Sequence, residues 1–333
     1  MNSQSWDEFG CYRVVEPPGS LPQNCWRIDN DPTPRKGETR VDVEVLNIDS
    51  SSFRQLEEQS QKEGRPLSEL ILAIVNERGK MHNPVTGSGG VLLGTTDDGR
   101  RIASLISLSL TPLKIDEILS IDNSSERVYI RGTAILFERT LYAEIPADLP
   151  EAVSLAVMDV AGAPARVAEI CRQKEQILIM GAGKAGLLSA AAVRRENRQA
   201  EILAVDVAAA PLEDMSTLKL CDSWQVLDGR SPLAFFDGIR EATARRLCDL
   251  TINVVNQPNT EGASILATRD GGTIYFFSMA TSFSQAALTA EGLARDVEML
   301  VGSGYTRGWT DYAFKLIRED PALLAHFEKR YGV

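Results

Sequence analysis

Hydrophobic and polar residues alternate along the first part of the chain. Residues 40–46 read Arg-Val-Asp-Val-Glu-Val-Leu, with a valine at every second position. A period of two places the valines on one face of a strand and the charged residues on the other. Clusters rich in proline or glycine, at 17–19, 31–34 and 87–90, separate such segments, and one helical stretch covers 54–77. The first 150 residues therefore predict a β-rich domain of half-buried strands.

A different pattern begins after Pro146 and Pro150. Residues 151–172 are rich in alanine and predict a helix. Short, largely apolar runs then alternate with helical stretches, at 176–180, 201–205, 250–255 and 273–277. Strands that are apolar on both faces are typical of a parallel sheet covered by helices on both sides. The predicted fold class is α/β. A Rossmann-type doubly wound parallel sheet follows the β-rich domain, and a final helix is expected over 311–331.

A glycine motif lies at the start of this second pattern. Residues 181–186 read Gly-Ala-Gly-Lys-Ala-Gly, between the apolar run 176–180 and a helical stretch at 187–195. In G-x-G-x-x-G turns the first glycine permits a tight turn, the second lets a pyrophosphate approach the backbone, and the third lets helix and strand pack closely. The helix N-terminus adds unpaired N–H groups and a positive dipole end. The residues predicted to bind a dinucleotide are Gly181, Ala182, Gly183, Lys184, Ala185 and Gly186.

Asp206 supplies the second half of this fingerprint. It ends the next apolar run, about 20 residues after the last glycine, as dinucleotide-binding units require. A carboxylate there accepts hydrogen bonds from the adenosine ribose and repels a 2′-phosphate, and no arginine follows it in residues 207–210. NAD is therefore the favoured cofactor, with NADP left open. The competing interpretation is a turn whose glycines serve only packing, with Asp206 capping a loop.

Composition narrows the class of partner. The chain has 35 basic and 46 acidic residues, a net charge of −11, which argues against nucleic acid or an anionic membrane and suits a small cationic substrate. No apolar run approaches the roughly 18 residues of a membrane span, and the N-terminus lacks the apolar core of a signal peptide. Five scattered cysteines and two histidines do not suit a metal site. We expect a soluble, cytoplasmic protein without a metal.

The order of these parts resembles the medium-chain dehydrogenase/reductase superfamily. Residues 36–45 are similar to its early GroES-like strand, and residues 146–152 to its usual entry into the cofactor domain. The resemblance implies a GroES-like catalytic domain over 1–154 and a Rossmann NAD-binding domain over 155–300. It also implies a C-terminal return over 301–333 that packs on the catalytic domain. Homodimers formed by edge-to-edge pairing of the cofactor sheets are common in this superfamily, so we expect a homodimer.

The positions of the zinc ligands are where this chain departs from zinc alcohol dehydrogenases. Asp49 stands where those enzymes have a cysteine ligand, and Ser51 stands at the proton-relay position two residues later. Ser88 replaces the histidine ligand, and Asp159 lies near the third ligand position. The resemblance therefore implies a zinc-free member. Carboxylates in these places suit an amine substrate, because they attract an ammonium and can accept its proton, whereas a metal cation would repel it.

Longer strings resemble one family within that superfamily, the 3,5-diaminohexanoate dehydrogenases. The matching stretches are residues 46–53, 79–90, 107–114 and 158–164. The implied reaction is the NAD(P)-dependent oxidative deamination of (3S,5S)-3,5-diaminohexanoate to 5-amino-3-oxohexanoate and ammonia, in lysine fermentation. The candidate catalytic residues are Asp49, Ser51, His82 and Asp159. The candidate substrate-binding residues are Lys80, Thr86 and Ser88.

Each of these candidates has a structural interpretation as well. Asp49 could cap the helical segment that follows it, and His82 could be an ordinary loop histidine. Lys80 and Arg54 could each bind the substrate carboxylate, and the sequence does not choose between them or identify the proton acceptor. Two other functions stay open: a zinc-free quinone or enone reductase, and a catalytically silent NAD-binding protein. The acids at 49, 159 and 206 count against the reductase, and the silent protein would bind cofactor without turnover.

Overall fold

The chain divides into two compact units. The computed structural model describes residues 6–85, 87–123, 125–278, 280–302 and 308–332, apart from the side chains of Ser50 and Ser51. The two units are Met1–Ala147 and Asp148–Val333. The sequence placed the boundary after residue 154, inside what is the single helix α3 (Glu151–Met158). Because α3 packs against the last two helices of the chain, it belongs whole to the second unit.

The first unit is built on a six-stranded antiparallel sheet. Its order is β6-β7-β3-β4-β5-β8. The strands are β3 (Thr39–Asn47), β4 (Val91–Thr96), β5 (Arg101–Ser104), β6 (Leu113–Asp122), β7 (Arg127–Leu136) and β8 (Tyr142–Glu144). The predicted strand over 40–46 is β3, which pairs with β4 and β7. Val41, Val43 and Val45 are buried while Asp42 and Glu44 are exposed, which confirms the alternation read from the sequence.

Two helices cover this sheet where the sequence predicted one. They are α1 (Ser50–Glu63) and α2 (Leu67–Arg78). Gly64 ends α1 with a left-handed φ of 62°, and Pro66 directly precedes α2. One helix therefore ends here and a second one begins. Leu56 of α1 and Ile71 of α2 share one buried core with residues of the sheet.

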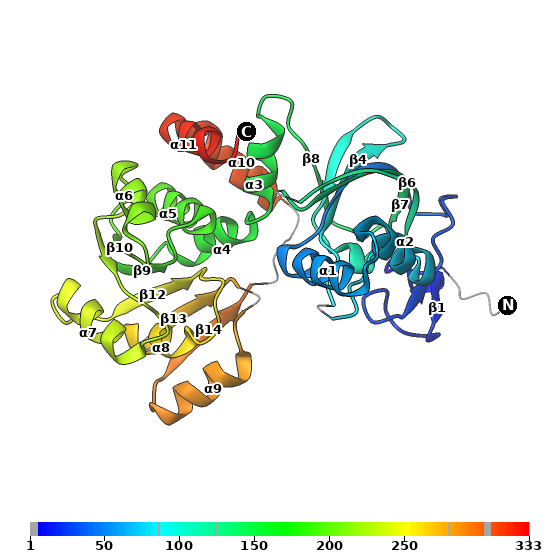
Figure 1. The fold of residues 1–333 in the computed structure, drawn as a ribbon. Coiled ribbons are helices and arrows are strands. Elements are labelled where there is room, and N and C mark those ends of the chain that lie inside the picture. Colours follow the sequence, from blue (N-terminus) through cyan, green and yellow to red (C-terminus); the bar gives the residue numbers. More distant parts are fainter. Residues whose placement is uncertain (1–5, 86, 124, 279, 303–307, 333) are drawn as a thin grey trace. The chain divides into compact units, whose positions relative to one another are not determined.

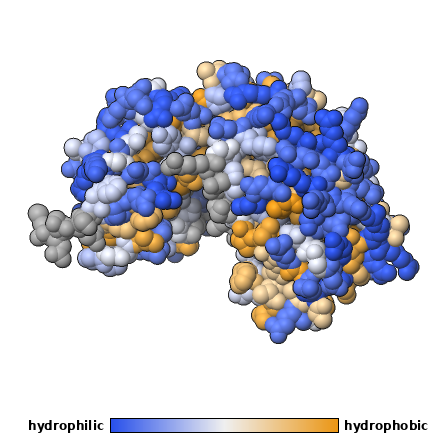
Figure 2. Space-filling view, turned by 180° about the vertical axis from the view of Figure 1, so that it is seen from behind, coloured by the Kyte–Doolittle hydropathy of each residue, from blue (hydrophilic) through white to orange (hydrophobic). Residues whose placement is uncertain are grey.

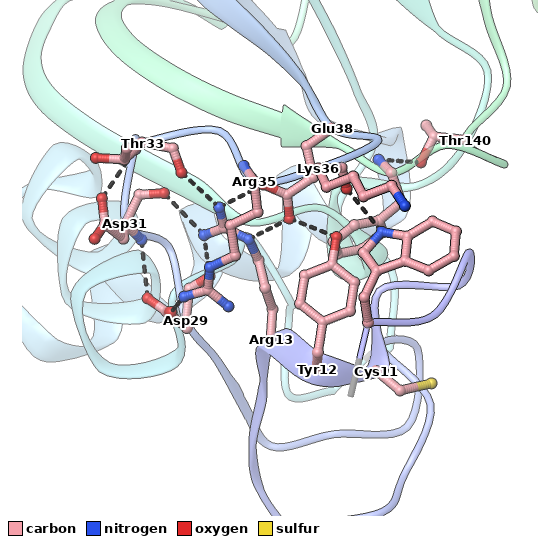
Figure 3. Close-up of polar contacts among 12 residues, drawn as sticks. Cys11, Tyr12, Arg13, Asp29, Asp31, Thr33, Arg35, Lys36, Glu38 and Thr140 are labelled. Atoms are coloured by element: carbon pink, nitrogen blue, oxygen red, sulfur yellow. Dashed lines mark hydrogen bonds and ion pairs between the residues drawn. The ribbon is translucent and has the colours of Figure 1, made fainter. Parts of the chain in front are cut away.

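A buried ion pair anchors the N-terminal elements of this unit, η1 (Cys11–Arg13), β1 (Val14–Glu16) and β2 (Arg27–Ile28). The side chains of Arg13 and Glu38 have no exposed surface, and Arg13 Nε and Nη2 donate to the two Glu38 oxygens at 2.5 and 2.7 Å. The other donors of Arg13 reach the carbonyls of Asp29, Asp31 and Thr33 (Figure 3). Every guanidinium N–H therefore has an acceptor, which is the condition for burying this charge.

The second unit contains a six-stranded sheet in which all neighbours are parallel. Its order is β11-β10-β9-β12-β13-β14. The strands are β9 (Gln176–Met180), β10 (Glu201–Asp206), β11 (Ser223–Val226), β12 (Cys248–Asn253), β13 (Thr268–Phe276) and β14 (Val297–Val301). Counted from β9, this is the 3-2-1-4-5-6 order of a doubly wound fold, whose order reverses beside the first strand. The predicted α/β class and Rossmann sheet are confirmed.

Helices cover both faces of this sheet (Figure 1). One face carries α4 (Gly162–Ile170), α5 (Lys184–Glu196) and α6 (Ala209–Thr217), and the other carries α7 (Pro232–Ala242), α8 (Glu261–Ala267) and α9 (Phe283–Gly292). Leu178 and Met180 of β9 pack in one core with Phe235 of α7 and Ala263 of α8. Being apolar on both faces, β9 is fully buried, as its sequence predicted.

The C-terminal segment corrects one prediction. Where one helix was expected there are α10 (Trp309–Glu319) and α11 (Pro321–Tyr331), because Asp320 caps a new helix that starts at a proline. Helix α10 packs on α3, α4 and α5, and both helices belong to the second unit. The buried face of α10, with Phe314 and Ile317, meets these alanine-rich helices. The packing of residues 301–333 on the first domain stays a prediction. None of the helices in the described ranges combines the length and hydrophobicity of a membrane span.

Candidate functional site

The glycine turn of the second unit has the shape of a phosphate-binding turn. Gly181 has a φ of 99°, and a Cβ on Gly186 would lie 1.9 Å from the carbonyl oxygen of Gly181, so both positions require glycine. A Cβ on Gly183 would meet no described atom within 4 Å, so the turn is open on that side. Helix α5 begins at Lys184 without a side-chain cap, which leaves its first N–H groups for a ligand. The turn follows β9, where the strand order reverses, and it fits a pyrophosphate.

Asp206 lies beside this turn at the end of β10. Its Oδ2 accepts a hydrogen bond from the N–H of Ala182 at 2.9 Å, and its Oδ1 accepts one from the N–H of Ala208 at 3.1 Å. The carboxylate therefore holds the glycine turn in place, a role that the sequence analysis did not assign to it. A carboxylate has about four acceptor positions, so each oxygen can accept a further bond from a ribose hydroxyl.

A cavity of about 310 Å³ opens beside Asp206, within the second unit. This volume lies at the lower end of the range for small-molecule pockets. Its apolar lining includes Met180, Val205, Leu227, Phe235 and Val255, and its polar lining includes Asp206, Asp228, Arg230, Gln257 and Thr260. An apolar pocket that ends in a carboxylate next to a phosphate-binding turn fits an adenosine.

Arg230 is a lining residue that the sequence analysis missed. Its Nε and Nη2 donate to the two oxygens of Asp228 at 2.8 to 3.1 Å, so the cavity holds this arginine already paired. Residues 207–210, which directly follow Asp206, contain no arginine. The parallel pairing of β10 with β11 brings the loop after β11 to the same edge of the sheet, and that pairing is the signal that could have found Arg230.

Asp159 is also part of the second unit, as the predicted Rossmann domain over 155–300 implied. It forms the C-cap of α3, and its carboxylate makes an ion pair with Lys184 Nζ of the glycine turn. The structure therefore brings two predicted site residues together, a carboxylate and the lysine of the cofactor motif. This contact joins the end of α3 to the start of α5, which no local pattern could reveal.

Asp49 and the glycine-rich turn over 87–90 come together in the first unit. Asp49 follows β3 and accepts a hydrogen bond from the N–H of Ser52 at 3.0 Å, which makes it the N-cap of α1. A Cβ on Gly90 would lie 2.0 Å from the carbonyl oxygen of Asn47, so the turn carrying Ser88 packs directly on the end of β3. Ser51 is in the first turn of α1 with its side chain outside the described part, and Thr86 lies outside the described residues.

His82 lies in the segment that is hydrogen-bonded to this turn. The N–H of its neighbour Asn83 donates to the carbonyl of Ser88 at 2.8 Å. His82 is half-buried, and its Nδ1 is buried with no hydrogen-bond partner among the described residues. Burial lowers the pKa of His82, and the positive charges of Lys80 and Arg78 lower it further. The imidazole is therefore neutral at neutral pH and is able to accept a proton.

The two predicted carboxylate anchors lie in different surroundings. Lys80 has no exposed surface, and its Nζ donates to the carbonyl of Pro22 at 2.7 Å. Burial lowers the pKa of its ammonium. Arg54 is highly exposed on α1 and lies 4.0 Å from the carboxylate of Glu58. Across the described residues, no three His, Cys, Asp or Glu side chains group so that they could hold a metal ion.

Solved structures with a similar fold match nearly the whole chain. AibC aligns over 90% of both chains with a TM-score of 0.53 and 18% identity. The mycobacterial protein Rv1454c, complexed with NADPH, aligns over 90% of both chains with a TM-score of 0.52 and 15% identity. At such low identity these matches establish the fold alone, a Rossmann unit joined to a GroES-like unit.

Sequence comparison is more specific. A family model described as the L-erythro-3,5-diaminohexanoate dehydrogenase N-terminal domain matches residues 12–146. Two curated relatives named L-erythro-3,5-diaminohexanoate dehydrogenase, from Acetoanaerobium sticklandii and Fusobacterium nucleatum subsp. nucleatum, are 42% and 43% identical to this chain. Each match covers 97% of this chain and 98% of the relative. The chain belongs to the family of L-erythro-3,5-diaminohexanoate dehydrogenases.

Proposed function

We propose that this protein is a nicotinamide-dependent dehydrogenase that oxidatively deaminates (3S,5S)-3,5-diaminohexanoate to 5-amino-3-oxohexanoate and ammonia, a step of lysine fermentation. The observation that carries this proposal is the identity of 42–43%, over almost the full length, with two relatives named for this substrate. The site agrees with it, because the second unit has a dinucleotide turn and the first unit has Asp49 where the resemblance places a zinc ligand.

The residues of the second unit fit the cofactor. The turn from Gly181 to Gly186 and the start of α5 would hold the pyrophosphate, and Asp206 would hold the adenosine ribose at the mouth of the cavity. When bound, the nicotinamide accepts a hydride from the substrate. We favour NAD because Asp206 repels a 2′-phosphate. A fold neighbour is complexed with NADPH, and NADP therefore stays the second candidate.

The residues of the first unit supply the proton chemistry. The substrate amine arrives as an ammonium, which must lose a proton before its carbon can give up a hydride. The carboxylate of Asp49 attracts the ammonium, and neutral His82 accepts the proton on its unpartnered Nδ1. Ser51, Thr86 and Ser88 hydrogen-bond the substrate in this proposal. Asp159, held by Lys184, balances charge at the cofactor turn.

The test is an assay of cofactor reduction with purified enzyme. Reduction of NAD by 3,5-diaminohexanoate, with one ammonia released per reduced cofactor, is the expected result. Turnover of quinones or enones with NADPH, and none with the diamine, would favour the reductase instead. Calorimetric binding of NAD without turnover of any of these substrates would favour a catalytically silent protein.

Two further parts of the proposal concern metal and assembly. Prolonged treatment with a chelator should leave activity unchanged, because aspartate and serine occupy the positions of the zinc ligands. Loss of activity that added Zn²⁺ restores would overturn our interpretation of Asp49, Ser88 and Asp159.

We also propose that the enzyme is a cytoplasmic homodimer, a proposal supported by the exposed edge strand β14 of the cofactor sheet.

A further inference from the structure

Two buried cationic side chains precede His82 in the first unit, where α2 ends. Arg78 is the last residue of α2 and is only 6% exposed, and Lys80 is fully buried. The positive charges of Arg78 and Lys80 both lower the pKa of His82. Buried like charges are unfavourable unless an anion or hydrogen-bond acceptors compensate them.

Arg78 lacks that compensation. Its guanidinium stacks on the ring of Trp26, with Cζ 3.8 Å from the ring centroid. Its Nε is buried and has no acceptor among the described residues. Burial lowers the pKa of the guanidinium, and the charge of its exposed neighbour Glu77 offsets this only in part. Arg13, the other buried arginine of this unit, has an acceptor for every N–H, so Arg78 is the exception.

The neighbours of Arg78 suit a carboxylate. A guanidinium presents a planar fork of N–H donors that matches the two oxygens of a carboxylate, and stacking on Trp26 fixes the plane of that fork. Lys80 is held by the carbonyl of Pro22 and adds positive charge alone. The Nδ1 of His82 is a second unpartnered buried nitrogen beside the same cluster.

We propose that Arg78, stacked on Trp26, binds the carboxylate of the substrate next to His82. This inference rests on the proposed function, and it names a carboxylate anchor other than Lys80 and Arg54. The chemistry of the substrate supports it. In 3,5-diaminohexanoate the reacting C3 is two bonds from the carboxyl carbon, so the group that binds the carboxylate must lie within a few ångströms of the reacting amine. Arg78 and His82 are four residues apart in the chain. In this proposal Arg78 binds the carboxylate and His82 accepts the proton.

The first experiment compares two substrates in the holoenzyme. Arg78→Gln should lower kcat/KM for 3,5-diaminohexanoate at least about thirtyfold, mainly through KM, because a desolvated charge pair is lost. The same change should leave kcat/KM for pentane-2,4-diamine, which lacks the carboxylate, within about twofold. Arg131→Gln, an exposed arginine of the same unit, is the matched control and should change neither. An equal loss for both substrates, or no loss for the carboxylate substrate, would overturn the proposal.

A binding measurement separates this proposal from the proposed function. In the wild type, 3-aminobutanoate should raise the melting temperature and bind in calorimetry, whereas 3-aminobutanamide, which lacks the charge, should not. Equal binding of the two compounds would overturn the carboxylate site without the need for any variant. Failure of the wild type to oxidise 3,5-diaminohexanoate would refute the proposed function, while this binding difference would still decide the site. Arg78→Lys keeps the charge without the fork; if Arg78→Gln does not fold, Arg78→Lys should show an intermediate loss for the carboxylate substrate alone.

Discussion

Asp49 combines two roles in one side chain, and a single substitution can separate them. Its Oδ1 caps α1 through the N–H of Ser52, and asparagine caps a helix about as well as aspartate. Asp49→Asn therefore removes the charge and keeps the cap. We expect kcat/KM for the diamine to fall at least about thirtyfold, with little change in the free energy of unfolding. Steady-state kinetics and urea unfolding measure the two effects.

The matched variant for this prediction is Asp49→Ala. It removes the cap as well as the charge and should cost about 1 kcal/mol of stability in addition to the loss of activity. Near-normal kcat/KM in Asp49→Asn would assign Asp49 to capping alone, and the substrate ammonium would then need another anchor.

Asp206 is the second residue whose roles can be separated. Asp206→Ala removes the proposed ribose acceptor and the repulsion of a 2′-phosphate, and it also frees the N–H groups of Ala182 and Ala208. Hydrogen bonds to a charged group are worth roughly 1.5–3 kcal/mol each, so the affinity for NAD should fall at least about tenfold while that for NADP rises. Equilibrium titration with both cofactors checks this, with Glu213→Ala on the exposed side of α6 as a control. Use of NADP as readily as NAD by the wild type would contradict our interpretation of this carboxylate.

At the scale of elements, the buried pair Arg13–Glu38 ties η1 and β1 to the start of β3. Glu38→Gln leaves the guanidinium buried without its counter-charge, and we expect a loss of about 3–5 kcal/mol in the free energy of unfolding. Burial raises the pKa of Glu38, but hydrogen bonds from Arg13, the N–H of Arg35 and Tyr12 lower it more, so the net pKa is below its usual value.

The lowered pKa of Glu38 in the folded state determines how its contribution to stability changes with pH. The stabilisation by Glu38 is complete above the unfolded pKa of about 4.3 and is lost as the pH falls through the lower folded value. Urea unfolding should therefore show that the free energy of unfolding falls less between neutral and acid pH in Glu38→Gln than in the wild type. Glu117→Gln, in an exposed pair with Arg131, should change stability by less than about 1 kcal/mol. Equal effects of the two substitutions would contradict this account.

Elements set by local pattern were predictable, and those set by tertiary contacts were not. The strands β3 and β9 and the glycine turn follow from period and spacing within a few residues. The ends of helices at Gly64–Pro66 and at Asp320–Pro321 are also marked by local signals. They were not predicted, because the helical periodicity on either side of each break suggested one continuous helix. The pair Asp159–Lys184 and the position of Arg78 on Trp26 depend on how distant segments meet. Lys80 was predicted as a substrate ligand because sequence alone does not report that a lysine is buried against a carbonyl.

At the scale of the whole molecule, the proposed homodimer predicts an interface, and exposed apolar residues suggest where it lies. Phe283 and Leu288 of α9 and Val301 at the end of β14 are 69%, 68% and 61% exposed. In Figure 2, which views the molecule from behind, hydrophobic residues gather on the lobe that α9 forms at the bottom of Figure 1. Strand β14 is an edge strand, so one row of its backbone N–H and C=O groups has no partner in the sheet. Exposed edges and apolar patches of this kind are normally covered by a partner.

We therefore expect light scattering on a sizing column to give twice the mass of the chain for the wild type. Val301→Asp combined with Leu288→Glu should shift the protein towards the monomer at low micromolar concentration, because two charges would be buried without partners in the paired edge. Leu233→Glu is the matched control: Leu233 is 72% exposed on α7 and should leave the dimer intact. A monomeric wild type would refute the dimer, and a dimer that survives the double substitution would place its interface elsewhere than on β14 and α9.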